Sequence, residues 1–379
     1  MFKLNNIELR EYRCYKKASF SFSKEKTIFV GGNATGKTSV VEAIYYLAFA
    51  KSFRTSKDEE IIRLNGDADN AFFLKGQFND GEIIEIGYDG TNKAIKKSGK
   101  KIRKLSQMVG YFMVALFYPD DLLLVKGEPR NRRSFIDSNL CQVDKEYLNA
   151  LQVFKKVLKE RNEYLKQLDG DINKINNNYL KALTRTYIET GEIIVKKRIE
   201  FIGEINEIAS KIVGEISDKK DEINVSFVPN TNVDNFWKTF EERKMQDLYA
   251  KTTTWGPTRD DFKVEINGKS ADGCASQGQI RTACLALKLA VVEYFKKVTE
   301  NIIIILDDVF SELDEVRQNK VLECISDNYQ VFITTTNINL LTKNALENSE
   351  IIEVFRGEQD GWRKIWRVTK TIRQKPSRF

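Results

Sequence analysis

The residues best suited to chemistry lie near the start of the chain, where Gly31 to Thr38 has the spacing Gly-x4-Gly-Lys-Thr. Residues 27–30 predict a short buried strand before it, and apolar residues at helical spacing after Lys37 predict a helix. A strand, a glycine-rich turn and a helix form the context in which this spacing binds a nucleotide polyphosphate. An accidental glycine turn is the alternative. The predicted loop comprises Gly31, Gly32, Asn33, Ala34, Thr35, Gly36, Lys37, Thr38 and Ser39.

Each part of this loop has a physical task in binding ATP. Glycines let successive backbone N–H groups converge on phosphate oxygens without interference from a Cβ atom. The start of the following helix adds partial positive charge. Lys37 would then reach the β- and γ-phosphates, and the Thr38 hydroxyl would bind Mg²⁺.

A second candidate for chemistry is the acidic pair Asp307-Asp308. It follows Ile302 to Leu306, an unbroken apolar run typical of a parallel strand buried on both faces. Unpaired carboxylates at such a place are costly, so we expect Asp307 to hold Mg²⁺ against the phosphates and Asp308 to orient the attacking water. A carboxylate that caps the next helix is the alternative.

Composition excludes several other kinds of chemistry. The 379 residues include no histidine, which removes the commonest general base and every Ser-His or Cys-His nucleophile. The five cysteines are far apart and form no Cys-x-x-Cys pair, so a zinc site is not expected. The cysteines are typical of small core residues in a protein of the reducing cytoplasm. No apolar run is long enough to span a membrane, and the first residues show no signal peptide.

Positive charge is concentrated in two short stretches. Residues 93–104 carry seven basic residues and no acid, and so do residues 361–379; without these fourteen, the net charge of +7 becomes −7. Local basic stretches attract phosphate backbones. A solvated hairpin and a frayed tail are the alternative.

The elements that must position these residues alternate between strand and helix at both ends of the chain. We predict an opening hairpin over residues 2–30 with its turn near Lys16-Lys17, and helical runs over 147–168 and up to about 216. The other predicted strands cover 71–78, 82–89, 113–117, 222–228, 262–266, 302–306 and 330–335, and the other predicted helices cover 235–252, 276–294 and 315–325. This pattern predicts an α/β fold.

The distance between Lys37 and Asp307 in the sequence implies a large insertion between two halves of one site. We therefore predict an ATPase head built from residues 1–125 and 256–379, with an inserted, mainly helical lobe at 126–255. No heptad repeat is sustained over many turns, so a long coiled-coil arm is not expected.

Along essentially its whole length the chain resembles the RecF family, which belongs with the SMC and ABC-type ATPases. The resemblance rests on the following motifs in their order: Tyr12 to Tyr15, the glycine-rich loop with Glu42-Ala43-Ile44, Lys51 to Arg54, Phe117 to Leu122, Val125 to Pro129, Arg132-Arg133 with Phe135 to Asp137, Gly256 to Asp261, Ser276 to Gln279, and Leu306 to Asp314. It differs from the family at Ala34, where glycine is usual, and at Thr258, where histidine is usual.

The resemblance implies an ABC-type head and further roles in binding ATP. Arg13 joins the nucleotide-binding residues. Ser276, Gln277, Gly278 and Gln279 look like the signature motif that caps the γ-phosphate on a partner copy; an ordinary capped helix is the alternative. Ser311 to Asp314 resemble the D-loop at the dimer seam. Thr334 to Thr336 lie where many ABC ATPases have a switch histidine, so a phosphate sensor here would be a hydroxyl.

The resemblance also implies a function in recombinational repair, replication and the SOS response. An ATP-dependent homodimer would clamp DNA at gaps or junctions and, with RecO and RecR partners, promote RecA loading, with slow DNA-stimulated hydrolysis as the switch. Candidate DNA contacts are Lys96, Lys97, Lys100, Lys101, Lys155 and Lys156; ordinary surface charge is the alternative. A small-molecule kinase and an SMC-like chromosome organiser are the competing functions.

Overall fold

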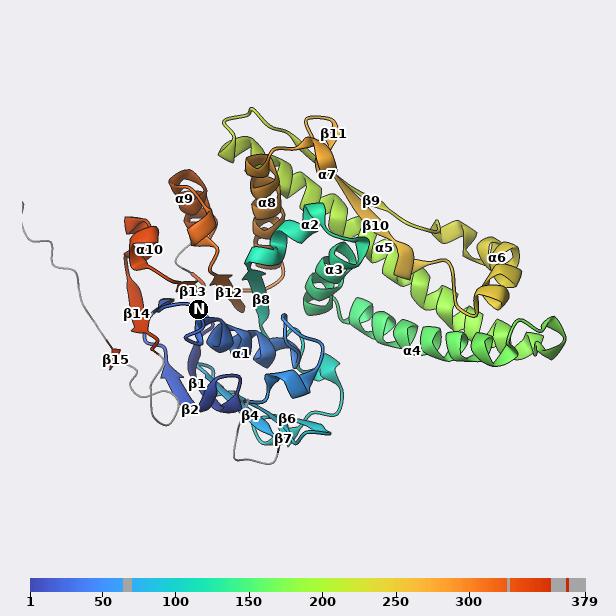
Figure 1. Ribbon diagram of the computed structural model, residues 1–379, viewed down its shortest axis with the longest axis horizontal. Coiled ribbons are helices and arrows are strands. Elements are labelled where there is room, and N and C mark those ends of the chain that lie inside the picture. The colour runs from blue at the N-terminus through green and yellow to red at the C-terminus, as the bar shows by residue number, and fades with distance from the viewer. Residues whose placement is uncertain (64–69, 326–327, 356–365, 368–379) are drawn as a thin grey trace, which may run out of the picture. The chain divides into compact units, whose positions relative to one another are not determined.

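A computed structural model describes residues 1–63, 70–325, 328–355 and the backbone of 366–367. Contacts divide the chain into two compact units (Figure 1). The first combines residues 1–119 with 295–379, and the second comprises residues 120–294. Among the described helices, none is both long and apolar enough to cross a membrane.

The first unit contains an antiparallel sheet, sheet A, with the strand order β2-β1-β4-β5-β6-β7. Its strands are β1 (Leu4–Tyr12), β2 (Tyr15–Ser21), β4 (Phe72–Phe78), β5 (Ile83–Tyr88), β6 (Lys93–Lys97) and β7 (Lys100–Lys101). Burial alternates along β4 and β5, so one face of sheet A packs into the core while the other is more exposed.

Sheet B has the order β15-β14-β3-β13-β12-β8, and its pairs are parallel except for β14 with β15. Its strands are β3 (Lys26–Val30), β8 (Met113–Phe117), β12 (Ile302–Asp307), β13 (Gln330–Thr335), β14 (Ser349–Glu353) and β15 (Trp366–Arg367). Strands β12 and β13 are buried along their whole length, as expected for parallel strands covered on both faces. Their register brings the ends of β3 and β12 to one edge of the sheet.

Helix α1 (Lys37–Phe49) connects the two sheets, because it contacts β1, β4 and β5 of sheet A and β8, β12 and β13 of sheet B. All but one of its residues are buried, the exception being Thr38. The unit also contains α9 (Glu315–Cys324) and α10 (Lys343–Leu346). A buried helix that is held on two sides fixes where the loop before it must lie.

The second unit is mainly helical and contains one small sheet of order β11-β10-β9. Its elements are α2 (Leu123–Lys126), α3 (Pro129–Val143), α4 (Lys145–Leu168), α5 (Asn177–Ile216), β9 (Ile223–Val228), α6 (Phe236–Ala250), β10 (Asp261–Ile266), β11 (Lys269–Ser270), α7 (Ala271–Cys274) and most of α8 (Gln277–Lys296). Helix α5 has 40 residues, about 60 Å at 1.5 Å per residue. Asp144 and Asn176 cap α4 and α5 through the backbone N–H groups of Tyr147 and Tyr179.

Short 3₁₀ turns join these elements at Asp58–Ile61, Leu105–Gln107, Pro119–Leu122, Ile172–Lys174, Val233–Asn235, Pro257–Arg259, Phe310–Glu312 and Ile338–Leu340. No disulfide joins the five cysteines, all of which lie within the described residues. The strands and helices predicted from the sequence are present, most of them with ends within about two residues, a common uncertainty in defining such ends.

The predicted position of the first turn was wrong. Tyr12 pairs directly with Tyr15, so the turn consists of Arg13 and Cys14, and Lys16 and Lys17 are exposed residues of β2. Tyr12 and Tyr15 are both buried, which draws the two strands together before the lysines are reached. Arg13 has a φ of 53° in this turn.

The contact units also differ from the predicted division of the chain. The first unit does combine both chain ends, but residues 256–294, which we predicted to be part of the head, group with the helical unit. One reason is that β10 pairs with β9 along its full length. A second is that Arg198 on α5 donates to Asp260 at 2.9 Å. A functional head and lobe with the predicted bounds remain a prediction.

The helical unit is held together by a fully buried ion pair between Arg161 and Asp247. Arg161 Nη2 lies 2.8 Å from Asp247 Oδ2, and its other nitrogens donate to the hydroxyls of Thr253 and Thr184. Asp247 also accepts hydrogen bonds from the Trp255 indole at 3.0 Å and from the backbone N–H of Thr254. Every charge in this network therefore has a partner, which is the condition for burying it.

We expect Arg161→Ala to lower the free energy of unfolding by about 3–5 kcal/mol, because the Asp247 carboxylate would stay buried without its partner. Urea unfolding followed by circular dichroism measures this loss. Lys159→Ala on the same helix is the control, since its pair with Glu163 is exposed and should contribute under about 1 kcal/mol. Equal small losses for both variants would contradict the role given to Arg161.

Candidate nucleotide-binding site

The predicted phosphate-binding loop lies between the end of β3 at Val30 and the start of α1 at Lys37. Gly32, Asn33 and Ala34 are exposed, whereas Lys37 and Ser39 are buried. Lys37 Nζ donates to the carbonyl oxygens of Gly31 and Gly32, both at 2.7 Å. Burial lowers the pKa of Lys37, and the negative charges of Asp308 and Asp307 partly oppose that shift.

Two of the loop glycines are required by close contacts. A Cβ atom on Gly31 would lie 2.3 Å from the carbonyl oxygen of Val354. Gly36 has a φ of 102°, and a Cβ there would lie 2.7 Å from Cys14 Sγ and 2.8 Å from Tyr15 Oη. The turn between β1 and β2 therefore packs directly against the loop.

Ala34, one of the two departures from the pattern that the chain resembles, has a φ of 59°. This is the left-handed region, which costs a residue with a Cβ atom roughly 1–2 kcal/mol. The usual glycine at this position would avoid that cost, so the loop of this chain contains local backbone strain.

Asp307 meets the loop although it lies far away in the sequence. The Thr38 hydroxyl donates to Asp307 Oδ1 at 3.0 Å across a separation of 269 residues, and the Thr334 hydroxyl donates to the same oxygen at 2.7 Å. Burial raises the pKa of Asp307, while the hydrogen bonds from Thr334 and Thr38 and the charge of Arg54 lower it.

These oxygens fit a Mg²⁺ ion that is shared with a nucleotide. Mg²⁺ prefers oxygen ligands and is commonly held by one or two carboxylates together with phosphates and water. The described residues contain no group of three or more Cys, Asp or Glu side chains placed to hold a metal ion. A metal at this site would therefore depend on Thr38, Asp307 and the phosphate oxygens.

Asp308 lies next to this pair in a strained conformation. Its φ is 54°, and its backbone N–H donates to the Thr334 hydroxyl at 3.0 Å. Its Oδ1 atom is buried and makes no hydrogen bond with any residue that the structure describes. A buried polar atom without a protein partner points to a missing water, ion or ligand, which supports the predicted role in orienting water.

Two of the three threonines at the end of β13 already make hydrogen bonds through their hydroxyls. The Thr334 hydroxyl binds Asp307, and the Thr335 hydroxyl donates to the carbonyl oxygen of Asn337 at 3.0 Å. Thr336 is half-buried. Of the three positions predicted to sense the γ-phosphate, Thr336 is the one without such a bond in the described structure.

Arg13 is held by a buried carboxylate on α1. Its guanidinium donates to both carboxylate oxygens of Glu42, with Nε to Oε2 at 2.8 Å, and its Nη1 donates to the Glu60 carbonyl oxygen at 2.6 Å. Glu42 is fully buried. These bonds use three of the five N–H donors of the guanidinium, so Arg13 positions α1 and has two donors left for a nucleotide.

Arg54, for which the sequence predicted no role, also lies near this site. Its Nη1 is 3.8 Å from Glu42 Oε2, and its side chain is 47% exposed. Ser52 links the same segment to Glu42 through its hydroxyl. The motif Lys51 to Arg54 was visible in the sequence, but the pairing that brings it to α1 is long-range and was not.

The signature-like residues form the start of α8 in the second unit. The Gln279 N–H donates to Ser276 Oγ at 3.2 Å, and the Ser276 N–H donates to Gln279 Oε1 at 2.9 Å, which is a capping box. Ser276, Gln277 and Gly278 are exposed, while Gln279 also donates to Asp221 at 2.7 Å. In the D-loop-like segment, Ser311 donates to the Asp308 carbonyl oxygen and Asp314 caps α9.

The lysines predicted to contact DNA differ in their exposure and in their contacts. Lys96, Lys100 and Lys101 are exposed. Lys97 Nζ lies 3.7 Å from the centre of the Tyr111 ring. Lys155 and Lys156 are exposed and lie 4.0 and 3.9 Å from the carboxylates of Asp137 and Glu160. The basic stretch 361–379 lies outside the described residues, apart from the backbone of 366–367.

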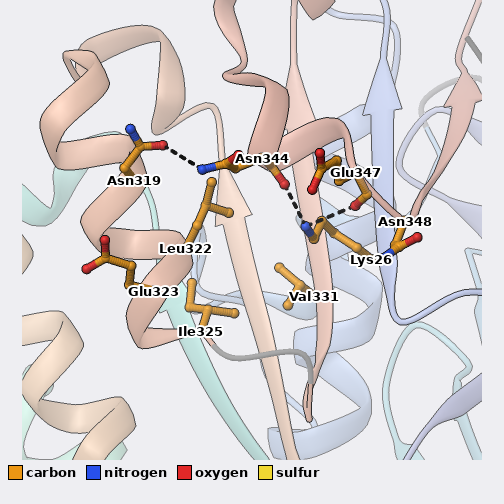
Figure 2. Close-up of a pocket in the computed structure, with 9 residues that line it drawn as sticks. All are labelled: Lys26, Asn319, Leu322, Glu323, Ile325, Val331, Asn344, Glu347 and Asn348. Atoms are coloured by element: carbon orange, nitrogen blue, oxygen red, sulfur yellow. Dashed lines mark hydrogen bonds between the residues drawn. The ribbon is translucent and has the colours of Figure 1, made fainter.

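A pocket in the first unit lies away from the phosphate-binding loop (Figure 2). Lys26 and Val331, near the starts of β3 and β13, line it together with residues of α9 and α10. Lys26 Nζ donates to the carbonyl oxygens of Asn344 and Glu347. Ligands of such sheets bind beyond the carboxyl ends of the strands, where the loop and Asp307 lie, so this pocket is not the nucleotide site.

Comparison with known proteins first defines the class of protein. Residues 2–337 match the family model described as AAA ATPase domain, so the chain carries an ATPase domain. The Smc head domain from Pyrococcus furiosus has a TM-score of 0.52 at 17% identity, over 93% of each chain, and shows a shared fold.

The particular family follows from nearer relatives. The chain is 37% identical over 371 residues to the DNA replication and repair protein RecF of Bacillus cereus strain AH820, which covers 94% of this chain and 98% of that protein. RecF of Halalkalibacterium halodurans is also 37% identical, over 93% of this chain and 98% of that protein. A solved structure of the recombination mediator protein RecF with ATP has a TM-score of 0.84 at 29% identity, over 93% of this chain and 96% of that chain. The chain belongs to the RecF family of DNA replication and repair proteins.

We expect Asp307→Asn to raise the melting temperature of the metal-free protein near pH 7 and to abolish the further stabilisation by Mg²⁺ and ATP. Because burial raises the pKa of Asp307, folding favours its protonated form. Its contribution to stability is therefore present below its ordinary pKa, about 3.9, and is lost as the pH rises through the raised value. The asparagine can still accept the hydrogen bonds from Thr38 and Thr334.

Calorimetry from pH 4 to pH 7, with and without Mg²⁺ and ATP, measures both effects. Glu25→Gln is the control, since Glu25 is exposed in the same unit and should change neither. A variant that is still stabilised by Mg²⁺ and ATP as strongly as the original chain would remove Asp307 from the metal site.

Proposed function

We propose that this chain is an ATP-driven DNA clamp of recombinational repair, in which two copies enclose ATP between them. The observation that carries the proposal is the hydrogen bond between Thr38 and Asp307, because it unites the two halves of an ATP site on one chain. The relatives are described as DNA replication and repair proteins and as a recombination mediator in the RecFOR pathway.

Within one copy, the loop binds the phosphates and Lys37 places its positive charge against them. Thr38 and Asp307 would hold Mg²⁺, whose positive charge would stabilise negative charge on the phosphate oxygens during hydrolysis. Asp308 orients the attacking water, a role consistent with its buried Oδ1, which has no hydrogen-bond partner among the described residues. Arg13 keeps α1 in place through Glu42 and remains a candidate for contact with the nucleotide.

The second half of the anion site comes from the partner copy. Ser276, Gln277 and Gly278 are exposed at the start of a 20-residue helix, where backbone N–H groups and the helix dipole favour an anion. In the proposed dimer these residues and Gln279 cap the γ-phosphate that is bound to the other copy's loop. Slow hydrolysis, stimulated by DNA, then releases the clamp.

The proposed partners follow from the family. DNA at a gap or at a junction of single and double strand would lie against the basic residues, and RecO- and RecR-like proteins would join the clamp to promote RecA loading in the cytoplasm and during the SOS response. The name RecFOR pathway in the solved relative supports this set of partners.

We expect light scattering to show a dimer with ATP and Mg²⁺, strengthened by duplex DNA, and a monomer with ADP or without nucleotide. Ser276→Arg should keep ATP binding by the monomer but prevent the dimer, because the bulky cation would occupy the seam. Lys37→Ala is the matched comparison and should lose ATP binding and the dimer together. A protein that stays monomeric with ATP, Mg²⁺ and duplex, while turning over ATP at a steady rate, would contradict the clamp and favour a small-molecule kinase.

We expect Asp308→Asn to accumulate the ATP-bound dimer, because the neutral amide no longer orients the attacking water. Single-turnover hydrolysis should fall by about 10²-fold or more, in the range of a lost general base, while ATP affinity stays within a few-fold. Glu25→Gln, which removes an exposed carboxylate outside the loop and the seam, is the control. Normal turnover by Asp308→Asn would exclude this residue from catalysis.

A further inference from the structure

The basic hairpin, residues 93–104 with strands β6 and β7, has two faces of different character. Ile95 is buried, and the Ile102 N–H donates to its carbonyl oxygen at 2.9 Å, so these two residues lie on the side that faces the core. Lys96 pairs directly with Lys101 across the strands, and Arg103 follows two residues later. Because side chains alternate along a strand, Lys96 and Lys101 share the outer face, and Arg103 is exposed just beyond the end of β7.

The core-facing side of the hairpin carries three lysines. Lys100, which pairs with Lys97 across the strands, is exposed, whereas the other two have contacts in the fold. Lys93 Nζ lies 2.8 Å from Asp58 Oδ2 and 5.0 Å from the centre of the Tyr46 ring. Lys97 lies 4.0 Å from Glu82 and packs over the Tyr111 ring. These two lysines therefore have partners in the fold, which leaves little of their charge for an external ligand.

The outer face of sheet A carries a row of charges that alternate in sign until they reach the hairpin. Cross-strand pairing places Glu8 beside Lys75, Lys75 beside Glu85 and Glu85 beside Lys96. Within this row Lys75 Nζ lies 3.9 Å from Glu85 Oε1. The next residue in the row, Lys101, repeats the positive sign instead of reversing it.

The end of the row is therefore left with excess positive charge. Like charges placed directly opposite each other destabilise an antiparallel pair. Lys96, Lys101 and Arg103 are exposed, and none of them forms an ion pair with another residue that the structure describes. The hairpin itself contains no acidic residue. An anion bound over this face would supply the missing negative charge.

The surroundings favour the backbone of duplex DNA as that anion. Several cations in a row suit a chain of phosphates, whose contacts carry no sequence information. Sites for single strands add aromatic side chains on which bases stack. The residues beside these cations on the outer face are Ala94 and Gly87, and the nearest ring in that row, Phe73, is half-buried with the Arg10 guanidinium 5.4 Å from its centre.

We propose that Lys96, Lys101 and Arg103 form a docking site for the phosphate backbone of double-stranded DNA on the outer face of sheet A. The inference rests on the proposed function, since it presumes that the chain binds DNA. It goes further by adding Arg103 to the contacts and by assigning Lys97 to the support of the hairpin instead.

The test measures duplex binding over a range of salt concentrations with ATP and Mg²⁺ present. The triple variant Lys96→Gln, Lys101→Gln and Arg103→Gln should bind a blunt duplex more weakly, with the slope of log affinity against log salt less steep by about 2 to 3, close to one unit for each lost phosphate contact. ATP affinity without DNA should not change.

Two control variants separate this site from general effects of charge. Lys159→Gln, Lys181→Gln and Lys238→Gln together remove the same three charges from exposed positions of the helical unit and should keep the original slope. Lys97→Gln should lower the melting temperature through the lost ring contact and also keep the slope.

Each remaining outcome has a definite meaning. If the original chain binds duplex and the hairpin triple variant keeps its salt slope, the inference is wrong while the proposed function stands. If the original chain binds no duplex in the presence of ATP, both the inference and the proposed function are wrong. If the triple variant loses binding of polyglutamate but retains duplex binding, the face serves an acidic protein and the inference is overturned.

Discussion

The arrangement of the site depends on the hydrogen bond between the Thr38 hydroxyl and Asp307 Oδ1. These residues are 269 positions apart, and no local preference could bring them together. The parallel register of sheet B does so, because Val30 at the end of β3 pairs with Thr335, and Thr334 pairs with Asp307 at the end of β12. A slip of one residue in either pairing would turn every side chain of a strand to the other face. The buried apolar residues before Asp307 therefore fix the position of its side chain, and the site depends on them as much as on its polar residues.

Several costly features gather at this edge of the sheet. Asp307 is buried, and burial raises its pKa, while Ala34 and Asp308 both have positive φ angles. Residues other than glycine in such conformations cost of order 1–3 kcal/mol each, and they persist where the surrounding structure holds them. Here α1, packed against both sheets, supplies that support. A bound Mg²⁺ and nucleotide would relieve the charge at Asp307, so the fold is built for the occupied state of the site.

Local patterns predicted that the loop and Asp307 would meet, as they do through Thr38, but not the whole geometry around them. The loop could be read from its spacing between a strand and a helix, and Asp307 from an acidic residue at the end of a buried apolar run. The bidentate contact of Arg13 with Glu42 could not be predicted in this way. It depends on a two-residue turn between the buried Tyr12 and Tyr15, whereas the sequence predicted a turn near Lys16-Lys17. The grouping of residues 256–294 with the helical unit by contacts has a related cause. It follows from the pairing of β10 with β9, which leaves no local mark in either segment.

The capping box at Ser276 and the proposed cap on a partner's γ-phosphate are compatible. A serine hydroxyl offers one donor and two acceptor positions, and the Gln279 N–H uses only one acceptor. Gln279 in turn holds the Ser276 N–H through its side-chain oxygen and is itself held by Asp221. The box therefore fixes the serine at the helix start while its O–H can still donate to an anion. An ordinary capped helix and a signature motif were opposed readings of the sequence, but the first is the support that the second requires.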